Sequence, residues 1–400
     1  MVFLLSLIAA VSQAEPALSP PPVSDMNIVV DTLHGKVIED AYRWLEDDKS
    51  PATRAWIAAQ NEYTQAILES LPYQKEISKR LAELIKTDYV STPHEKNNRF
   101  FMYKRAAEQD QYSIYVRDGL DGKDRLLIDP ALIDPEMLSS VNIVDISNDG
   151  EILAYAIRRG GKDETSIKLL NISTGAELPD SFPEAVYFGF SMTGDKNGIY
   201  YAPREDNGSH IYYHQMGTPM SENKVVFGGE YGGESALGCQ VSPNGRYLII
   251  TIYHGSAGSN EYFYRDLAGG DEIIPLTEGI EAFFEDRMAG NIMLLKTNWK
   301  APNGRILAVD LQNPARENWR EIIPENDAAM KGFSAVGGKI FVNYLENVVS
   351  KIKIFDLNGN NVGEIAFPSL GTVSDIYGDW ESNNAFFNYS SYHIPATIFH

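Results

Sequence analysis

The chain has 400 residues, of which 44% are hydrophobic, and a formal net charge of −21. This excess of negative charge disfavours binding to nucleic acid or to an anionic membrane surface, because both attract proteins through Lys and Arg. The single cysteine, Cys239, excludes an internal disulfide and a zinc site built from several cysteines. We therefore expect no nucleic-acid partner, no membrane partner and no metal site.

The first 26 residues have the composition of a leader and a linker. Residues 2–11 form a short apolar run, and small residues at 12–14 offer a cleavage site, so residues 1–14 resemble a secretory signal peptide. No Lys or Arg precedes the run, which leaves either a weak signal or a start further upstream. We expect a periplasmic or secreted protein, with a cytoplasmic one as the alternative. Residues 15–26 are rich in proline and are predicted to be a linker without a fold of its own.

Residues 27–86 contain the helices that the sequence predicts. Ser50 can cap a helix, and Pro51 suits its first position. Apolar residues then recur three and four positions apart until Pro72 interrupts the pattern. A second helix follows, and its predicted buried face comprises Ile77, Leu81, Leu84 and Ile85. These two helices need a surface against which to pack.

From about Arg99 the sequence changes to short alternating strands separated by turn residues. One polar residue before a turn recurs at intervals of 53, 44, 51, 44 and 46 residues, namely Asp118, Asn171, Gln215, Asp266, Asp310 and Asp356. Two similar turn motifs, at 147–150 and 242–245, lie 95 residues apart, which is two such periods. A period of this length built from four short strands is typical of a β-propeller blade. We therefore predict a mainly β protein with a seven-bladed β-propeller over residues 87–400.

The same spacing places the next member of this polar series at about position 402. The sequence reaches Thr397, Ile398, Phe399 and His400, so these residues are expected in the third strand of the seventh blade. A natural domain boundary falls in an exposed linker rather than inside a strand. We therefore expect the seventh blade to be incomplete.

Residues at both ends of the chain carry a family resemblance. At the front they are Val30, Asp31, His34, Gly35, Asp40, Tyr42 to Glu46, Ser50, Pro51, Trp56, Gln60 and Asn61, and at the end Phe386, Phe387, Ser391, Pro395 and Thr397 to Phe399. In order and spacing they resemble the N-terminal segment and the last propeller blade of the prolyl oligopeptidase family of serine peptidases, family S9A. The resemblance covers about residues 24–400, and Ala41 departs from it because the family usually has proline there.

The resemblance implies a domain plan and an activity. Members of this family insert a seven-bladed propeller into an α/β-hydrolase domain, which combines an N-terminal helical segment with the C-terminal third of the chain. A Ser-Asp-His triad in that domain cleaves short peptides after proline without a cofactor, and the propeller restricts access to it. On this plan residues 27–86 belong to the hydrolase domain. The expected partners are short proline-containing peptides and the rest of the hydrolase domain, or a partner that supplies it.

The sequence offers no nucleophile of the type that this activity needs. No serine of these 400 residues stands in a G-x-S-x-G turn, which holds the nucleophile of an α/β-hydrolase. The nearest match surrounds Ser334, lacks the second glycine and falls in a predicted blade. We therefore assign no catalytic residue and expect these residues alone to be inactive. The family match suggests one substrate-lining residue, Phe188, for which core packing is the alternative.

Other candidates for chemistry have simpler interpretations. His210 and His214 lie on a predicted strand, about 13 Å apart, so they cannot share a metal ion, and both are predicted to face solvent. Cys239 precedes a turn and is predicted to be a small buried residue rather than a catalytic thiol. The acidic run at 46–48 is predicted to be a solvated loop.

Two hypotheses about function remain open. The first is part of a prolyl oligopeptidase-like serine endopeptidase, in which the propeller gates access to the active site. The second is a non-catalytic propeller that binds peptides or another protein, with a split enzyme as its variant. Both predict a poorly stable lone monomer, because apolar residues of the helical segment would lack a covering surface and the seventh blade would leave a strand edge unpaired.

Overall fold

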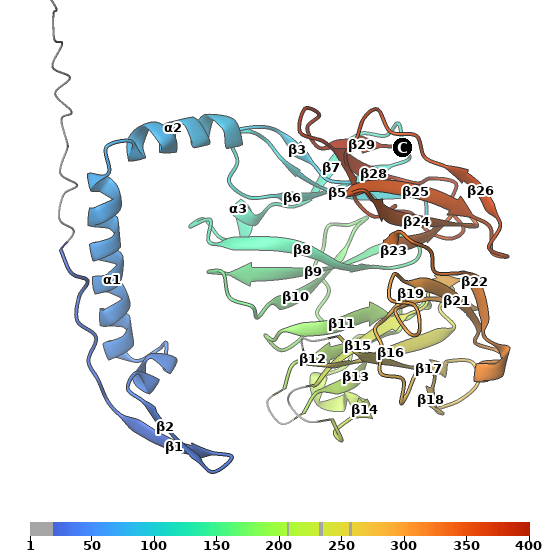
Figure 1. Ribbon diagram of the computed structural model, residues 1–400, viewed down its shortest axis with the longest axis horizontal. Coiled ribbons are helices and arrows are strands. Elements are labelled where there is room, and N and C mark those ends of the chain that lie inside the picture. Colours follow the sequence, from blue (N-terminus) through green and yellow to red (C-terminus); the bar gives the residue numbers. More distant parts are fainter. Residues whose placement is uncertain (1–18, 206–207, 232–234, 256–257) are drawn as a thin grey trace, which may run out of the picture. The chain divides into compact units, whose positions relative to one another are not determined.

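The computed structural model describes residues 19–205, 208–231, 235–255 and 258–400 (Figure 1). The chain divides into two compact units, Met1–Thr87 and Asp88–His400. The predicted signal peptide, residues 1–14, and the beginning of the predicted linker lie outside the described residues.

The first unit consists of a hairpin and two helices. β1 (Val29–Leu33) pairs with β2 (Lys36–Asp40), a 3-10 turn covers Arg43–Glu46, and α1 (Pro51–Ser70) and α2 (Gln74–Ile85) follow. The start of α1 is the predicted one, because the Ser50 hydroxyl accepts a hydrogen bond from the Thr53 amide at 3.1 Å. Pro72 lies between the two helices, as predicted.

The described part of the predicted linker is held along α1. Trp56, Gln60 and Tyr63 donate side-chain hydrogen bonds to Ser24, Pro22 and Ser19 at 2.8, 3.0 and 2.6 Å, respectively. Residues 19–26 contain no helix or strand. The expectation of a segment without a fold of its own is thus incomplete, since α1 fixes the path of residues 19–24.

The apolar face of α2 is exposed. The prediction that Ile77, Leu81, Leu84 and Ile85 are buried is wrong for this chain, because between 51% and 58% of each residue remains accessible. The amphipathic pattern correctly located the helix. The described residues simply provide no surface that covers this face.

The second unit contains seven antiparallel sheets in chain order, which confirms the predicted seven-bladed propeller (Figure 1). Blade 1 contains β3 (Tyr89–Val90), β4 (His94–Lys96), β5 (Arg99–Arg105), β6 (Ser113–Asp118) and β7 (Asp124–Ile128), and blade 2 contains β8 (Ser139–Ile146), β9 (Ile152–Arg159) and β10 (Ser166–Asn171). Blade 3 contains β11 (Tyr187–Met192), β12 (Gly198–Pro203), β13 (His210–Gln215) and β14 (Lys224–Gly228), and blade 4 contains β15 (Ser235–Val241), β16 (Tyr247–His254), β17 (Asn260–Asp266) and β18 (Ile274–Pro275). Blade 5 contains β19 (Phe284–Ala289), β20 (Ile292–Thr297), β21 (Arg305–Asp310) and β22 (Arg320–Ile323), and blade 6 contains β23 (Ala329–Val336), β24 (Lys339–Glu346), β25 (Val349–Phe355) and β26 (Asn361–Glu364). Blade 7 contains β27 (Thr372–Val373), β28 (Phe387–Ser390) and β29 (Thr397–Phe399).

Short helical segments connect some of these strands. The four-residue helix α3 (Pro130–Ile133) joins blades 1 and 2, and 3-10 turns cover Met220–Glu222 and Arg316–Asn318. No sequence pattern predicts α3, although Asp129 caps it and Pro130 starts it. A single turn is too short for an apolar periodicity to reveal.

The periodic polar residues of the sequence mark the end of the third strand in six blades. Five of them end β6, β10, β13, β17 and β21, and the sixth directly follows β25. Three aspartates show the cause, since Asp266, Asp310 and Asp356 each accept a hydrogen bond from the backbone amide two residues later, at 3.0, 2.9 and 2.9 Å. This local turn, which short acidic side chains favour, follows the third strand and thereby sets the period.

Blade 7 has three strands, and β29 is the third of them, as the spacing predicts. Among the described residues, β29 pairs with β28 alone. The first and last blades meet through Phe100 and Phe386, whose rings pack edge to face at 5.9 Å. An ion pair between Lys96 and Asp379 at 3.1 Å lies at the same seam. The ring of seven blades is therefore joined by side chains of the first and last blades.

Candidate functional site

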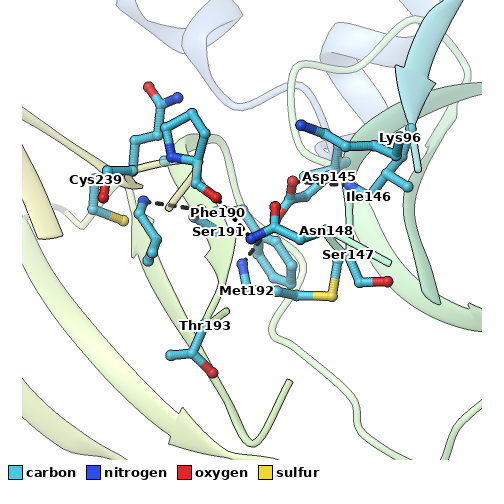
Figure 2. A pocket seen from close by; sticks show the side chains of 16 residues that line it. Lys96, Asp145, Ile146, Ser147, Asn148, Phe190, Ser191, Met192, Thr193 and Cys239 are labelled. Carbon is cyan, nitrogen blue, oxygen red and sulfur yellow. Dashed lines mark hydrogen bonds between the residues drawn. The ribbon is translucent and has the colours of Figure 1, made fainter. Parts of the chain in front are cut away.

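A pocket of about 300 Å³ lies among the innermost strands of blades 1 to 4. Its polar wall includes Lys96 from β4, Asp145 from β8, Ser191 from β11 and Gln240 from β15. Figure 2 shows Lys96 and Asp145 together on one side of this pocket and Cys239 on the opposite side. Each of these four blades contributes an innermost strand, so the pocket lies at the propeller axis.

Polar side chains of this wall tie neighbouring blades together. The Asp145 carboxylate accepts the Met192 amide of the next blade at 2.7 Å, and the Ser191 hydroxyl accepts the Val241 amide of the following blade at 3.0 Å. The Met192 and Val241 amides face the preceding blade, and these hydrogen bonds supply their acceptors. The first role of this wall is thus structural.

The environment of Asp145 shifts its acidity. Loss of contact with water raises the pKa of its carboxyl to about 6, although the Met192 and Ile146 amides and the Lys96 charge act in the opposite direction. Both carboxylate oxygens already accept backbone amides, at 2.7 and 2.8 Å. Asp145 is therefore a titrating structural group, and we assign it no catalytic role.

Cys239 is 7% accessible and free, which confirms the prediction of a small buried residue. Burial raises the pKa of its thiol far above the ordinary range. Because the thiolate is the reactive form of cysteine, this group is inert at neutral pH. Ser334, the serine nearest to the hydrolase motif, is also buried, and its hydroxyl accepts the Ile376 amide at 3.2 Å.

Phe188 lies in a β-bulge of β11. Tyr187 pairs with Pro203 and Gly189 with Ala202, so Phe188 is an extra residue without a partner on β12. Its side chain is 40% accessible. The core-packing alternative therefore does not describe it, because a side chain this accessible is not enclosed in a core.

Glycine is required directly after Phe188. A Cβ on Gly189 would lie 2.2 Å from the Cys239 backbone nitrogen, far inside van der Waals contact. The absence of a side chain allows β11 to approach β15 closely at the bulge. In the sequence, the pair Phe188 and Gly189 is therefore the feature that marks this bulge.

A second hollow, of about 440 Å³, lies beside Phe188 between blades 2 and 3. Val144, Gly189 and Phe190 line both this hollow and the axial pocket. Asn142 from β8 and Arg158 from β9 belong to its wall, and the sequence analysis named neither. No sequence motif marks them, because only the pairing of β8 with β9 brings them to one face.

The prediction that both histidines of β13 face solvent is wrong. His214 is fully buried, with its ring nitrogens 2.9 Å from the Asp180 carboxylate and 2.8 Å from the Asn223 amide oxygen. Its burial follows from the segment between β10 and β11, which brings Asp180 and Phe182 against β13. His210 is half-buried and lies 2.7 Å from Glu205.

The described residues contain no group of three or more histidine, cysteine, aspartate or glutamate side chains that could hold a metal ion. None of the helices in the described ranges has both the length and the apolar composition needed to cross a membrane.

Comparison with known proteins identifies the fold. Residues 21–400 match the family model described as the prolyl oligopeptidase N-terminal beta-propeller domain. A prolyl endopeptidase of Elizabethkingia miricola is 29% identical over 98% of this chain, and the dipeptidyl aminopeptidase BI of Pseudoxanthomonas mexicana is 24% identical over 95%. These alignments cover 57% and 56% of the two relatives, so the chain spans a little over half of their length.

Solved structures agree with this match. A structure from a study of two prolyl endopeptidases superposes with a TM-score of 0.87 at 29% identity, over 94% of this chain and 57% of that one. The prolyl oligopeptidase B of Galerina marginata, bound to a 35-residue substrate, has the same fold with a TM-score of 0.81 at 20% identity, over 96% of this chain and 58% of that one. The front motif, the seven sheets and these matches agree, and the chain belongs to the prolyl oligopeptidase family through its N-terminal β-propeller domain.

Proposed function

We propose that this chain is the substrate-gating part of a serine endopeptidase that cleaves short peptides after proline. The observation that carries the proposal is the match of residues 21–400 to the propeller domain of this family. The propeller holds an axial pocket and the accessible Phe188, both suited to contact a peptide. The nucleophile would come from a hydrolase part, since these residues contain no G-x-S-x-G turn.

The first unit supports the same proposal. Val30, Val37, Leu81 and Leu84 are all more than 50% accessible. Apolar surface of this extent is characteristic of an interface. We propose that the hydrolase part covers this surface, which would make residues 27–86 one portion of that domain.

Joining this chain to the remaining C-terminal part of the Elizabethkingia miricola prolyl endopeptidase tests the proposal. We expect the joined protein to hydrolyse a blocked fluorogenic Gly-Pro peptide and the 400 residues alone to be inactive. The matched control replaces the serine of the relative's nucleophile turn by alanine. A folded joined protein that binds the peptide but does not cleave it would contradict the proposal.

A non-catalytic peptide-binding propeller is the second candidate function. The axial pocket and the accessible Phe188, which can contact a peptide without any hydrolase part, favour it. It predicts that the natural gene product binds proline-containing peptides and that no form of it hydrolyses them. Intact mass and hydrolysis measured on protein purified from its source separate the two candidates.

We also propose that the protein is exported to the periplasm or secreted. The support is the apolar run at residues 2–11 followed by small residues. Cell fractionation with N-terminal sequencing tests this, and a cytoplasmic protein that retains Met1 would contradict it.

A further inference from the structure

The hollow beside Phe188 has the composition of a ligand site. Its floor is apolar, formed by Val144, Ala156, Ile167 and Phe190, and its rim carries polar side chains. An apolar floor with a few polar groups at the rim is the usual construction of a small-ligand pocket. Its volume of about 440 Å³ suits one or two amino-acid side chains rather than a folded partner.

Three rim side chains have no hydrogen-bond or ion-pair partner among the described residues. They are Asn142, Arg158 and Asp163, and all three are exposed. Asn142 pairs directly with Ala156, and Arg158 follows two residues later, so both project from the same face of blade 2. One cation and one amide donor therefore line the hollow without a hydrogen-bond partner, as does the Asp163 carboxylate.

The neighbouring arginine shows the contrast. Arg159 projects from the opposite face of β9. It forms one ion pair with Glu136 at 3.1 Å and a second with Asp134 at 3.6 Å. Arg158 has no such partner in the part of the chain that the structure describes, although the protein carries 55 acidic residues. A guanidinium that stays unpaired in so acidic a protein is available to bind a carboxylate.

The hollow lies at the end of the propeller at which the chain of this unit begins. In blade 1, Tyr89 of the innermost strand β3 pairs with Arg105 at the end of the next strand, β5. The innermost strand of a blade therefore starts at the end of the propeller where the neighbouring strand finishes. Phe188 near the start of β11 and Arg158 near the end of β9 lie at this same end. On the proposed function, the hydrolase part joins the propeller here.

We propose that this hollow is a subsite for an acidic residue of the peptide substrate. Arg158 binds the side-chain carboxylate, Asn142 donates a hydrogen bond to the peptide, and Phe188 contacts its apolar portion. Asp163 repels the carboxylate and so limits affinity. The inference rests on the proposed function for its choice of a proline-containing peptide.

Because the net charge is −21, a preference for an acidic peptide over a neutral one would be specific evidence for this subsite. The long-range field of the chain repels an acidic peptide. Stronger binding of an acidic peptide than of its neutral analogue therefore requires a local cation in contact with it. General charge attraction cannot produce the same result.

The test is a ligand-observed NMR titration of the 400-residue chain with two blocked peptides. They are acetyl-Ala-Glu-Ala-Gly-Pro-amide and the same peptide with Gln in place of Glu. We expect the Glu peptide to bind about fivefold to tenfold more tightly, the effect of one charge-assisted contact. Binding of neither peptide up to about 5 mM, or equal binding of both, overturns the proposal.

Matched variants locate the contact. Arg158→Gln is expected to abolish the preference for Glu, whereas Arg159→Gln keeps it. Asp163→Asn is expected to tighten binding of the Glu peptide about twofold to threefold, and Glu164→Gln, which changes a neighbouring charge outside the hollow, to leave it unchanged. A preference that survives Arg158→Gln, or that Arg159→Gln removes, overturns the assignment.

Phe188→Ala provides a second readout, because it is expected to weaken the binding of the Glu peptide and of the Gln peptide equally. Binding and hydrolysis are measured separately, so the two proposals fail in different ways. Hydrolysis by the joined protein without any preference for Glu rejects the subsite alone. A preserved preference without hydrolysis rejects only the proposed peptidase function.

Discussion

The two units of this chain use apolar residues in opposite ways. The propeller encloses its large side chains, such as Phe101 and Tyr344, between neighbouring blades, where they are at most 1% accessible. The first unit leaves Ile77 and Leu81 of α2 more than half accessible. Apolar patterning that is equally clear in sequence thus completes a core in one unit and forms an open surface in the other.

The largest effect is expected in the propeller core. Phe101 is fully buried in the cluster between blades 1 and 2. Phe101→Ala should lower the free energy of unfolding by about 3–5 kcal/mol, because it removes an aromatic ring and leaves a cavity. Urea unfolding followed by fluorescence measures this, with Leu81→Ala on the open face of α2 as the control. Equal losses from both variants would show that the two units are not packed differently.

A smaller loss is expected at the buried histidine of blade 3. Asp180 accepts hydrogen bonds from both His214 and the Gly217 amide, at 2.9 and 2.6 Å. Asp180→Ala leaves two donors without this acceptor, and we expect a loss of about 3 kcal/mol. Asp110→Ala, at an exposed site without such a contact, should change stability by less than about 0.5 kcal/mol. A neutral Asp180→Ala would mean that another group satisfies His214.

The pH dependence of stability should reveal Asp145. Its pKa is about 6 in the folded protein, against an ordinary value of 3.8. Between these values the folded protein retains a proton that the unfolded chain releases, so this contribution to stability is lost as pH rises from about 4 to about 6.

Asp145→Asn removes that titration. The stability of the variant relative to wild type should rise by about 3 kcal/mol across this window and remain constant above it. Unfolding curves recorded at half-unit pH steps measure the difference. Parallel pH profiles for the two proteins would contradict the assignment.

The smallest change in stability is expected on α2. Leu81→Gln and Leu84→Gln together should alter the free energy of unfolding by less than about 1 kcal/mol, since both residues are already exposed and Gln is a good helix former. The same variant should reduce binding of an apolar dye and slow aggregation. A sharp loss of stability would show that this face is covered in the isolated chain.

The number and order of the blades follow from local sequence patterns. Asp266, Asp310 and Asp356 form the same short turn after the third strand of their blades, and such a turn depends on local residues alone. The Ser50 cap and Pro51 likewise fixed the start of α1. The family resemblance also rests on short sequence motifs, which can be recognised without any knowledge of tertiary contacts.

The tertiary structure decided burial and the composition of the candidate sites. His214 looked like a solvent-facing strand residue until Asp180, 34 positions earlier, was found against its ring. Arg158 and Asn142 reach one hollow only because β8 pairs with β9 in a particular register. The apolar stripe of α2 was visible in sequence, but the surface that should cover it was not. Periodicity reports which faces of an element are apolar, whereas contacts between distant segments decide which of those faces are buried.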